Sequence, residues 1–233
     1  MNSSIIRRIY RVKDIENIQN KLNLLGSNRK IKFDAVGFLT TRLITTILLA
    51  LILILFSGIK YFIIPFILII YYNLFYYFLI TDTINKRIKK LDLEALTFFE
   101  ILTLTLESGR NLENAIEITV SNVDSELSDE FKRSLMEMKF GRSLIESLED
   151  LKKRIPSETI NNIILNITQT NIFGNSILDT MYSQIDFLRD KQILEIKGKI
   201  NKLPNKISII SVVFIVPLIL LIILGPLFIN FIG

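Results

Sequence analysis

The stretch Phe140-Gly-Arg-Ser-Leu-Ile-Glu-Ser-Leu148 interrupts a helical pattern and resumes it within three residues. The same interruption occurs in Gly109-Arg-Asn-Leu-Glu-Asn-Ala-Ile116 and in Gly174-Asn-Ser-Ile-Leu-Asp-Thr-Met181, so the three glycines lie 32 and 33 residues apart. Glycine adopts the left-handed conformation that ends a helix at little cost, and the side chain two residues later can cap the next helix. The sequence therefore predicts three tight helix corners, each made of a glycine and a cap: Gly109 and Asn111, Gly141 and Ser143, and Gly174 and Ser176.

Three corners of this kind imply six helices in the middle of the chain. We expect these helices near residues 92–108, 111–122, 127–140, 143–154, 157–173 and 176–202. A nearly constant period could also indicate a solenoid of the tetratricopeptide kind. Because the repeats are few and lack the aromatic positions of that family, a closed helical bundle is the better interpretation.

The composition is that of a membrane protein. Half of the 233 residues are hydrophobic and the mean hydropathy is +0.42, which is high for a soluble domain. A spanning helix needs about 20 apolar residues. Three strongly apolar segments without charge approach or exceed this length: Leu43 to Ile59, Tyr61 to Thr81 and Ile207 to Gly233. The first segment is short, so we expect Arg42 to extend its side chain to the lipid headgroups. The predicted fold is all-α, a polytopic membrane protein with three transmembrane helices and a cytoplasmic six-helix bundle.

The basic residues predict the orientation in the membrane. Residues 1–37 carry eight Lys and Arg against three acids, and further basic residues flank the central region at 81–90 and 191–206. Since cytoplasmic loops are enriched in Lys and Arg, we expect the N-terminus and the central region in the cytoplasm and the C-terminus outside. This divides the chain into a cytoplasmic amphipathic segment (1–37), a transmembrane hairpin (38–81), a cytoplasmic bundle (82–206) and a C-terminal transmembrane helix (207–233).

The usual parts of an enzyme are missing from the sequence. The chain has no cysteine and no histidine, and none of its nine glycines belongs to a phosphate-binding loop. We therefore predict no catalytic, cofactor-binding or metal site. A membrane enzyme with paired carboxylates stays open as an alternative, with Glu94 and Glu100 or Asp129 and Glu130 as candidates. A transporter or channel subunit is a second alternative, although it should carry ionisable groups inside its spans.

The predicted bundle is acidic while its edges are basic. Residues 91–190 hold eighteen acids and nine bases. The basic edges suit anionic lipid headgroups, and the acidic surface suits a basic protein partner rather than nucleic acid. We take Glu126, Asp129 and Glu130 as candidates for that partner's contact surface. The helix at 92–108 is apolar almost all round, which predicts either the central core helix or a contact between subunits.

The corner motifs, in their order and membrane context, resemble the type II secretion system F domain. An apolar helix ends in Glu-Ser-Gly-Arg-Asn-Leu-Glu-Asn-Ala-Ile, then comes Phe-Gly-Arg-Ser-Leu-Ile-Glu-Ser-Leu, then a third glycine corner and a span with a Gly-Pro pair, over about residues 92–232. Lys21-Leu-Asn-Leu-Leu-Gly26 resembles the short amphipathic helix that precedes the first span in family members. A single F domain behind an N-terminal hairpin resembles the TadB/TadC branch of the tight-adherence (Flp-type) pilus.

The resemblance implies a role without catalytic residues. Family members are platform proteins of the cytoplasmic membrane, on which a cytoplasmic hexameric ATPase acts while pilin subunits pass from the bilayer into a filament. A single F domain further implies pairing, either as a homodimer or with a second F-domain protein. The expected partners are thus an assembly ATPase, pilins, a second platform subunit and membrane lipids, with no nucleic acid and no cofactor.

Overall fold

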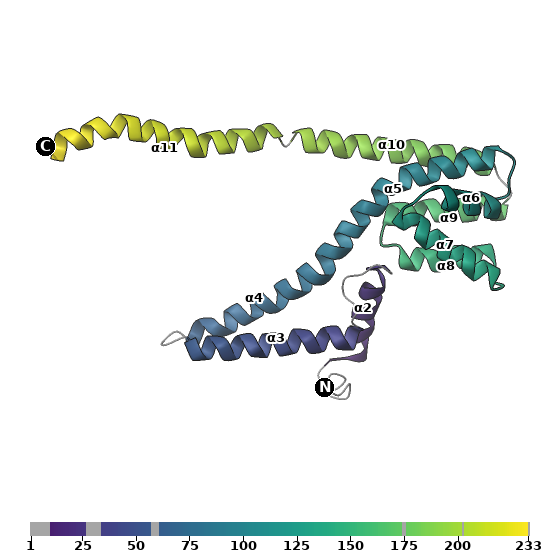
Figure 1. Cartoon of the computed structure of the whole chain (residues 1–233), viewed down its shortest axis with the longest axis horizontal. Coiled ribbons are helices and arrows are strands. Elements are labelled where there is room, and N and C mark those ends of the chain that lie inside the picture. Colours follow the sequence, from purple (N-terminus) through teal and green to yellow (C-terminus); the bar gives the residue numbers. More distant parts are fainter. Residues whose placement is uncertain (1–9, 27–33, 57–60, 174–175, 202, 233) are drawn as a thin grey trace. The chain divides into compact units, whose positions relative to one another are not determined.

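The computed structural model describes residues 10–26, 34–56, 61–173, 176–201 and 203–232. Within these ranges the chain forms helices and turns and no strand, which confirms the all-α fold class. The chain divides into two compact units, Met1–Ser183 and Gln184–Gly233, and each is described by itself. The helices of the first unit, labelled in Figure 1, are α2 (Val12–Asn23), α3 (Ala35–Phe56), α4 (Ile64–Tyr76), α5 (Asp82–Glu107), α6 (Leu112–Asn122), α7 (Glu126–Lys139), α8 (Leu144–Arg154) and α9 (Glu158–Phe173).

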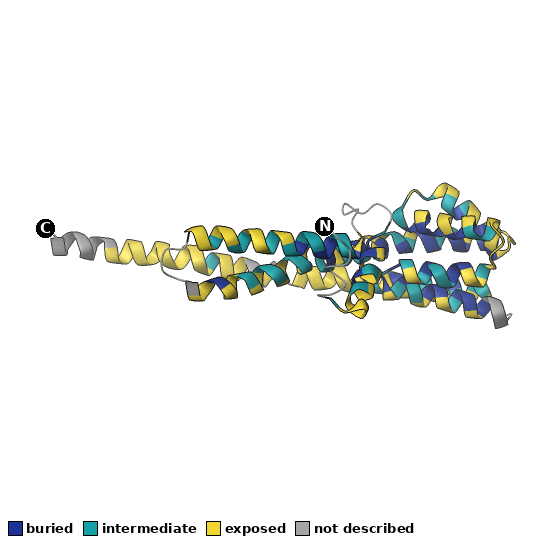
Figure 2. Ribbon diagram, turned by 90° about the horizontal axis from the view of Figure 1, so that it is seen from below, coloured by how far each residue is buried: buried dark blue, intermediate teal, exposed yellow. Residues whose placement is uncertain are grey.

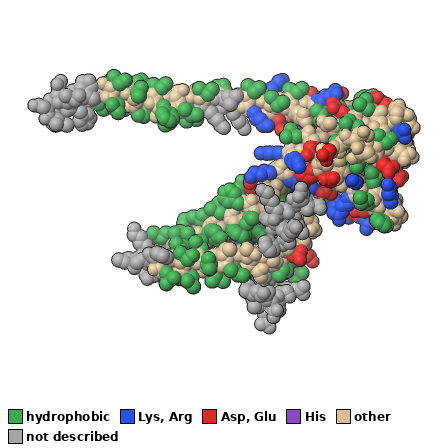
Figure 3. All heavy atoms as spheres, in the orientation of Figure 1, with side chains coloured by type: hydrophobic (Ala, Val, Ile, Leu, Met, Phe, Trp, Pro, Cys, Tyr) green, Lys and Arg blue, Asp and Glu red, His purple; other side chains and the backbone are tan. Residues whose placement is uncertain are grey.

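Two further helices lead to the C-terminus. Helix α10 (Ile177–Asn201) begins in the first unit and continues into the second, and α11 (Leu203–Ile232) follows it. Three helical segments of the described residues are long and apolar enough to cross a membrane: Ala35–Leu55, a window within Ile64–Glu107, and Ile207–Leu224. Hydrophobic side chains cover these helices, while the charged side chains gather on the helices between α5 and α10 (Figure 3). The three predicted spans are thus present, and the first begins at Ala35 rather than at Leu43.

The N-terminal helix α2 packs on protein rather than standing apart as a surface helix. Its apolar face lies against α3 and against the chain that follows α4, while its charged residues face outward. The Gln19 side chain also accepts a hydrogen bond at 3.0 Å from the Ala35 backbone, one of the N–H groups that the start of α3 leaves unpaired. The buried cluster that joins these elements contains Ile18, Leu22, Leu25, Ala35, Phe38, Leu39 and Ile80.

The second span runs into the bundle without a break. Helix α4 continues through one π-helical segment, Tyr77–Thr81, into α5, so that residues 64–107 form a single helix of 44 residues. The prediction of a helix starting near residue 92 was wrong. No glycine or proline occurs between Tyr77 and Glu107, and Lys and Arg are good helix formers, so nothing stops the helix. The membrane hairpin and the bundle core therefore share one continuous element.

Helix α5 contributes much of the bundle core, because Leu91, Ala95, Phe98, Phe99, Leu102 and Leu106 are buried; Figure 2 shows the buried residues of the chain in dark blue. Phe98 stacks on Phe131 of α7 with ring centroids 4.5 Å apart, and Phe99 meets the Phe98 ring edge-on at 5.5 Å. Truncating such a buried ring to alanine costs about 3–5 kcal/mol. Helix α5 is thus the expected core helix, but Leu93 and Leu104, three turns apart on one face, are 61 % and 63 % exposed within this chain.

The glycine corners have the geometry that the sequence suggests where the structure describes them. Gly109 and Gly141 have φ angles of 80° and 95°. At the second corner, the backbone N–H of Arg142 donates to the backbone oxygen of Glu137 at 3.2 Å, and that of Gly141 donates to the backbone oxygen of Met138 at 2.9 Å. These are the two hydrogen bonds of a Schellman motif. Gly174 lies outside the described residues.

All three predicted caps hold the first turn of a helix. The Asn111 side chain accepts from Asn114 at 2.9 Å, and the Ser176 side chain accepts from Asp179 at 3.3 Å. Ser143 makes a full capping box, in which its hydroxyl accepts from the Glu146 backbone and the Glu146 carboxylate accepts from the Ser143 backbone. These residues act on the backbone and fix where α6, α8 and α10 begin.

Candidate functional site

The densest polar cluster of the first unit is centred on Arg87 of α5, whose side chain is only 5 % exposed. Its Nε and Nη2 atoms each lie 2.6 Å from a carboxylate oxygen, of Glu126 and of Glu130. Its Nη1 atom donates to the backbone oxygens of Leu24 and Arg154, at 2.7 and 2.8 Å. One guanidinium thus joins α5 to α2, α7 and α8, and we call this cluster the Arg87 junction.

Helix geometry explains why the junction forms at this place. Glu126 and Glu130 are one turn apart on α7, so both carboxylates face the same side. Leu24 and Arg154 lie at the ends of α2 and α8, where the last carbonyl groups have no partner within their own helix. A cation is favoured at the C-terminal end of a helix, and the planar guanidinium offers enough donors to serve two such ends and two carboxylates together.

Gly26 completes the contact between α2 and the junction. It has a φ of 79°, which suits glycine, and a Cβ atom at this position would lie 2.8 Å from the guanidinium carbon of Arg87. A side chain here would therefore push the end of α2 away from Arg87. The glycine that closes the predicted amphipathic helix is needed both for the turn and for the close approach.

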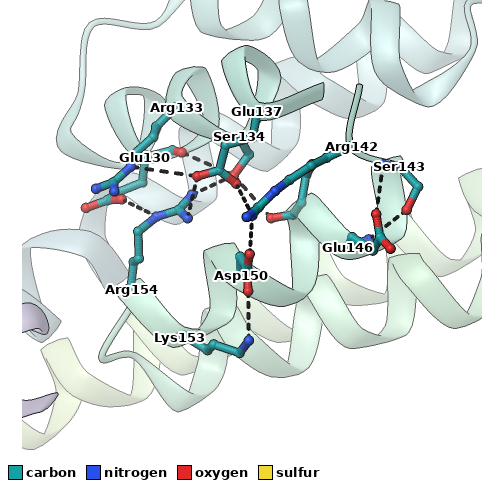
Figure 4. Close-up of polar contacts among 11 residues, drawn as sticks. Glu130, Arg133, Ser134, Glu137, Arg142, Ser143, Glu146, Asp150, Lys153 and Arg154 are labelled. Carbon is teal, nitrogen blue, oxygen red and sulfur yellow. Dashed lines mark hydrogen bonds and ion pairs between the residues drawn. The ribbon is translucent and has the colours of Figure 1, made fainter. Parts of the chain in front are cut away.

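A ladder of alternating charges continues from the junction along α7 and α8 (Figure 4). The second oxygen of Glu130 accepts from Arg154 at 3.2 Å, and Arg154 also donates to Glu137 at 3.0 Å. Arg142 lies 3.6 Å from Glu137 and pairs with Asp150. The hydrogen bond from Lys153, followed by the attraction of Lys153 and Arg142, lowers the pKa of Asp150. The ladder ties α7 to the second half of α8 and to the turn between the two helices.

The proposed acidic contact surface does not exist as three neighbouring exposed carboxylates. Glu130 is buried and paired with Arg87 and Arg154, and Glu126 is paired with Arg87 and with Lys90 at 3.0 Å. Burial raises the pKa of Glu126, but the hydrogen bonds from Arg87 and Lys90 outweigh it and hold the pKa below its usual value. Only Asp129, on another side of α7, is exposed. The helical period separates Asp129 from Glu126 and Glu130, which share Arg87 as their partner.

Arg42 is held between helices and does not reach outward as expected. It is 7 % exposed and lies within the apolar segment Ala35–Leu55. Its Nε and Nη2 atoms donate to the Tyr72 backbone oxygen at 3.2 and 2.8 Å, and its guanidinium carbon lies 3.3 Å from the centroid of the Tyr72 ring. The Tyr10 hydroxyl completes the group through a 2.6 Å hydrogen bond to that of Tyr72. Arg42 thus fastens α3 to α4, because a cation over an aromatic ring is attracted to its face.

The carboxylates considered for catalysis serve other purposes where the structure shows their contacts. Glu94 accepts from the Leu127 backbone at 3.1 Å, at the start of α7, and Glu130 belongs to the Arg87 junction. Among the described residues no group of three Asp or Glu side chains is placed to hold a metal ion. The chemistry of the described polar clusters is that of joining helices and capping their ends.

The comparison with known proteins identifies one family. The family model described as type II secretion system (T2SS), protein F, matches residues 98–225, which is more than half of the chain. No curated protein and no solved structure matches this chain. The matched range begins inside α5, covers the corners at Gly109 and Gly141, and ends within α11.

Proposed function

The chain belongs to the type II secretion system protein F family, and from this premise we propose that it is the membrane platform of a type IV (Tad/Flp-like) pilus or a type II secretion-like machine. In this role it couples a cytoplasmic assembly ATPase to the extraction of pilins from the bilayer and to filament assembly. The family and the three apolar helices of the described residues make it a multi-pass membrane protein of secretion or pilus machinery. The pilus type and the ATPase coupling are the proposal.

The observation that supports this role best is the continuous helix Ile64–Glu107. Its first half belongs to a membrane span, and its second half carries Phe98 and Phe99 in the bundle core. A motor that pushes or turns the bundle therefore acts directly on a membrane helix. The Arg87 junction adds α2, which packs on α3, so the same displacement reaches both helices of the membrane hairpin.

We further propose that the bundle faces the cytoplasm, where an ATPase can reach it. The basic flanks at residues 1–37, 81–90 and 191–206 favour a cytoplasmic N-terminus and bundle, with the C-terminus outside. The apolar outer faces of α3, α4 and α11 then face lipid and the transmembrane helices of pilins. Anionic lipid headgroups are attracted by the lysines at the start of α5.

Pairing with a second platform subunit is part of the proposal. The exposed Leu93 and Leu104 lie on one face of α5, outside the bundle core. A single F domain, unlike a duplicated one, supplies only one such bundle. The second subunit is either another copy of this chain or a related F-domain protein.

The transporter alternative has gained no support from Arg42. An ionisable residue inside a span is expected on the pathway of an ion or substrate. Arg42 instead donates two hydrogen bonds to the Tyr72 backbone carbonyl and makes a cation–π contact with the Tyr72 ring. A side chain used in this way holds two helices together.

Co-purification tests the proposed function. The full-length protein, in mild detergent and with an affinity tag, is mixed with the pilus or secretion assembly ATPase of the same organism, and with an unrelated hexameric ATPase as a control. We expect specific retention of the assembly ATPase and loss of filaments when the gene is deleted. Equal retention of both ATPases, or filaments formed without this protein, would refute the proposal.

A further inference from the structure

The glycine corners gather at one end of the bundle, away from the Arg87 junction. The junction holds the start of α7 and the end of α8, so the corner between them at Gly141 lies at the other end of both helices (Figure 1). Arg87 lies near the start of α5, and the corner at Gly109 follows the end of that helix. The two corners that the structure describes thus lie on the bundle end that is farthest from the membrane hairpin.

Two of these corners lie next to each other. Lys139, in the last turn of α7, donates to Glu117 of α6 at 2.9 Å. This hydrogen bond and the attraction of Glu117, with a smaller contribution from Glu113, raise the pKa of Lys139. The end of α7 therefore faces the first two turns of α6, and the surface at this place combines both corners. We call it the corner surface and define it by Arg110, Met136, Phe140 and Arg142.

Phe140 is the unusual member of the corner surface, because 90 % of its side chain is exposed. Met136, one turn earlier on α7, is 50 % exposed, so the two form an apolar pair. The Schellman ending before Gly141 and the capping box at Ser143 fix the backbone on both sides of Phe140. Because the backbone around Phe140 is already ordered, binding of a partner to this ring costs little conformational entropy, which favours affinity.

Each of the two corners also carries an arginine. Arg110 and Arg142 each follow the glycine of a corner and precede the first turn of α6 or α8. Arg110 is exposed, and Arg142 is about half exposed while it contacts Glu137 and Asp150. Of the carboxylates nearby, Glu146 accepts from the Ser143 backbone, and Glu117 is paired with Lys139. Aromatic residues, Met and Arg are the types enriched in protein interfaces.

We propose that the corner surface is the docking site for the assembly ATPase, with Phe140 inserted in an apolar pocket whose rim carries carboxylates opposite Arg110 and Arg142. This inference rests on the proposed function and names the contact it requires. It also reverses the expected charge of the contact: the partner presents acidic rather than basic groups. The bundle end opposite the membrane hairpin is the part of the first unit that a cytoplasmic ring reaches first.

Single substitutions in the full-length protein test the docking site. The variants Phe140→Ala and Arg110→Glu are compared with the wild type for affinity to the immobilised assembly ATPase. Leu165→Ala and Lys13→Glu are matched controls, because both residues are exposed and lie on α9 and α2 rather than on the corner surface. We expect Phe140→Ala and Arg110→Glu each to weaken binding about tenfold or more, with the controls unchanged. Because exposed charges are screened at raised salt, the Arg110→Glu difference should shrink as salt increases.

The possible results separate the inference from the proposed function. If the wild type binds and both variants bind equally well, the docking site is wrong and the proposed function stands. If the wild type itself fails to bind, the proposed function fails first. If Phe140→Ala changes the oligomeric state of the protein and leaves ATPase binding intact, the surface joins copies of this chain and the inference is overturned. Unchanged melting temperatures of the variants show that each is folded.

Discussion

Replacing Arg87 by alanine should destabilise the protein more than any other single change of charge in the first unit. The substitution removes the donors to Glu126, Glu130 and the backbone oxygens of Leu24 and Arg154. These groups belong to three different helices or their ends. Arg87→Ala should therefore loosen α2 and α8 as well as weaken α7.

The magnitude follows from the burial of the partners. Removing one member of a buried ion pair costs about 3–5 kcal/mol, because the other charge is left without compensation. Here the cost should lie toward the lower limit of that range, since Glu130 keeps Arg154 and Glu126 keeps Lys90. A loss of this size is a large part of the 5–15 kcal/mol that typically stabilises a domain. Lys86→Ala, one residue earlier, removes only an exposed pair with Asp82 and should cost less than about 1 kcal/mol.

Chemical denaturation and hydrogen exchange in detergent measure both effects. For Arg87→Ala we expect a lower midpoint of unfolding and faster exchange in the last turns of α2 and α8, while Lys86→Ala behaves like the wild type. Arg87→Lys should recover only part of the loss, because an ammonium group cannot reproduce the planar fork of four hydrogen bonds. If Arg87→Ala and Lys86→Ala have equal stability, the junction does not hold these helices together.

Three further predictions concern pH, turns and caps. The pKa of Glu126 is lower in the folded than in the unfolded state, so ionised Glu126 stabilises the fold fully above about pH 4.5, and this contribution is lost as the pH falls through the folded pKa. The free energy of unfolding, measured from pH 7 to 3, should therefore fall with pH, and it should fall less in Arg87→Ala. Gly109→Ala should lower the free energy of unfolding by about 1–2 kcal/mol because of its positive φ alone. Gly26→Ala has almost the same φ but should lower it more, because the new Cβ would contact Arg87. Equal losses for the two variants in chemical denaturation would exclude that contact. Ser143→Ala should lower stability by about 1 kcal/mol through the lost cap, measured against Ser121→Ala as a control on an exposed face of α6, and a cost no greater than that control's would contradict the capping box.

The local features of this fold could be predicted from the sequence. A glycine followed two residues later by Asn or Ser is a short-range signal, and the backbone conformation and cap that it specifies depend on few other residues. The corners at Gly109 and Gly141 and the cap at Ser143 therefore have the expected geometry. The three spans could also be predicted, because a membrane helix needs an apolar stretch of sufficient length, but the start of the first was misplaced because its helix includes Arg42.

Contacts between distant residues could not be predicted in this way. Arg87 meets partners that lie 39 to 67 positions away in the chain, and in the sequence it is one of several basic residues near a membrane span. The prediction of an acidic contact surface from the net charge of the bundle was wrong for the same reason. An excess of acids does not show which carboxylates are paired, and Glu130 was counted as surface although two arginines enclose it. The spacing of the two acids was one signal: Glu126 and Glu130 are one turn apart on a helix, so that a single cation can pair with both.

The location of the bundle relative to the membrane tests the account most directly, since an ATPase can act on it only from the cytoplasm. The chain contains no cysteine, so a single substitution supplies the only thiol. Asp129 is an exposed position on the bundle, whereas its neighbour Ser128 is buried and unsuitable. In intact cells a membrane-impermeant maleimide should label Gly233→Cys and should leave Asp129→Cys unlabelled until the membrane is opened. Labelling of Asp129→Cys in intact cells, with Gly233→Cys protected, would contradict the proposed platform.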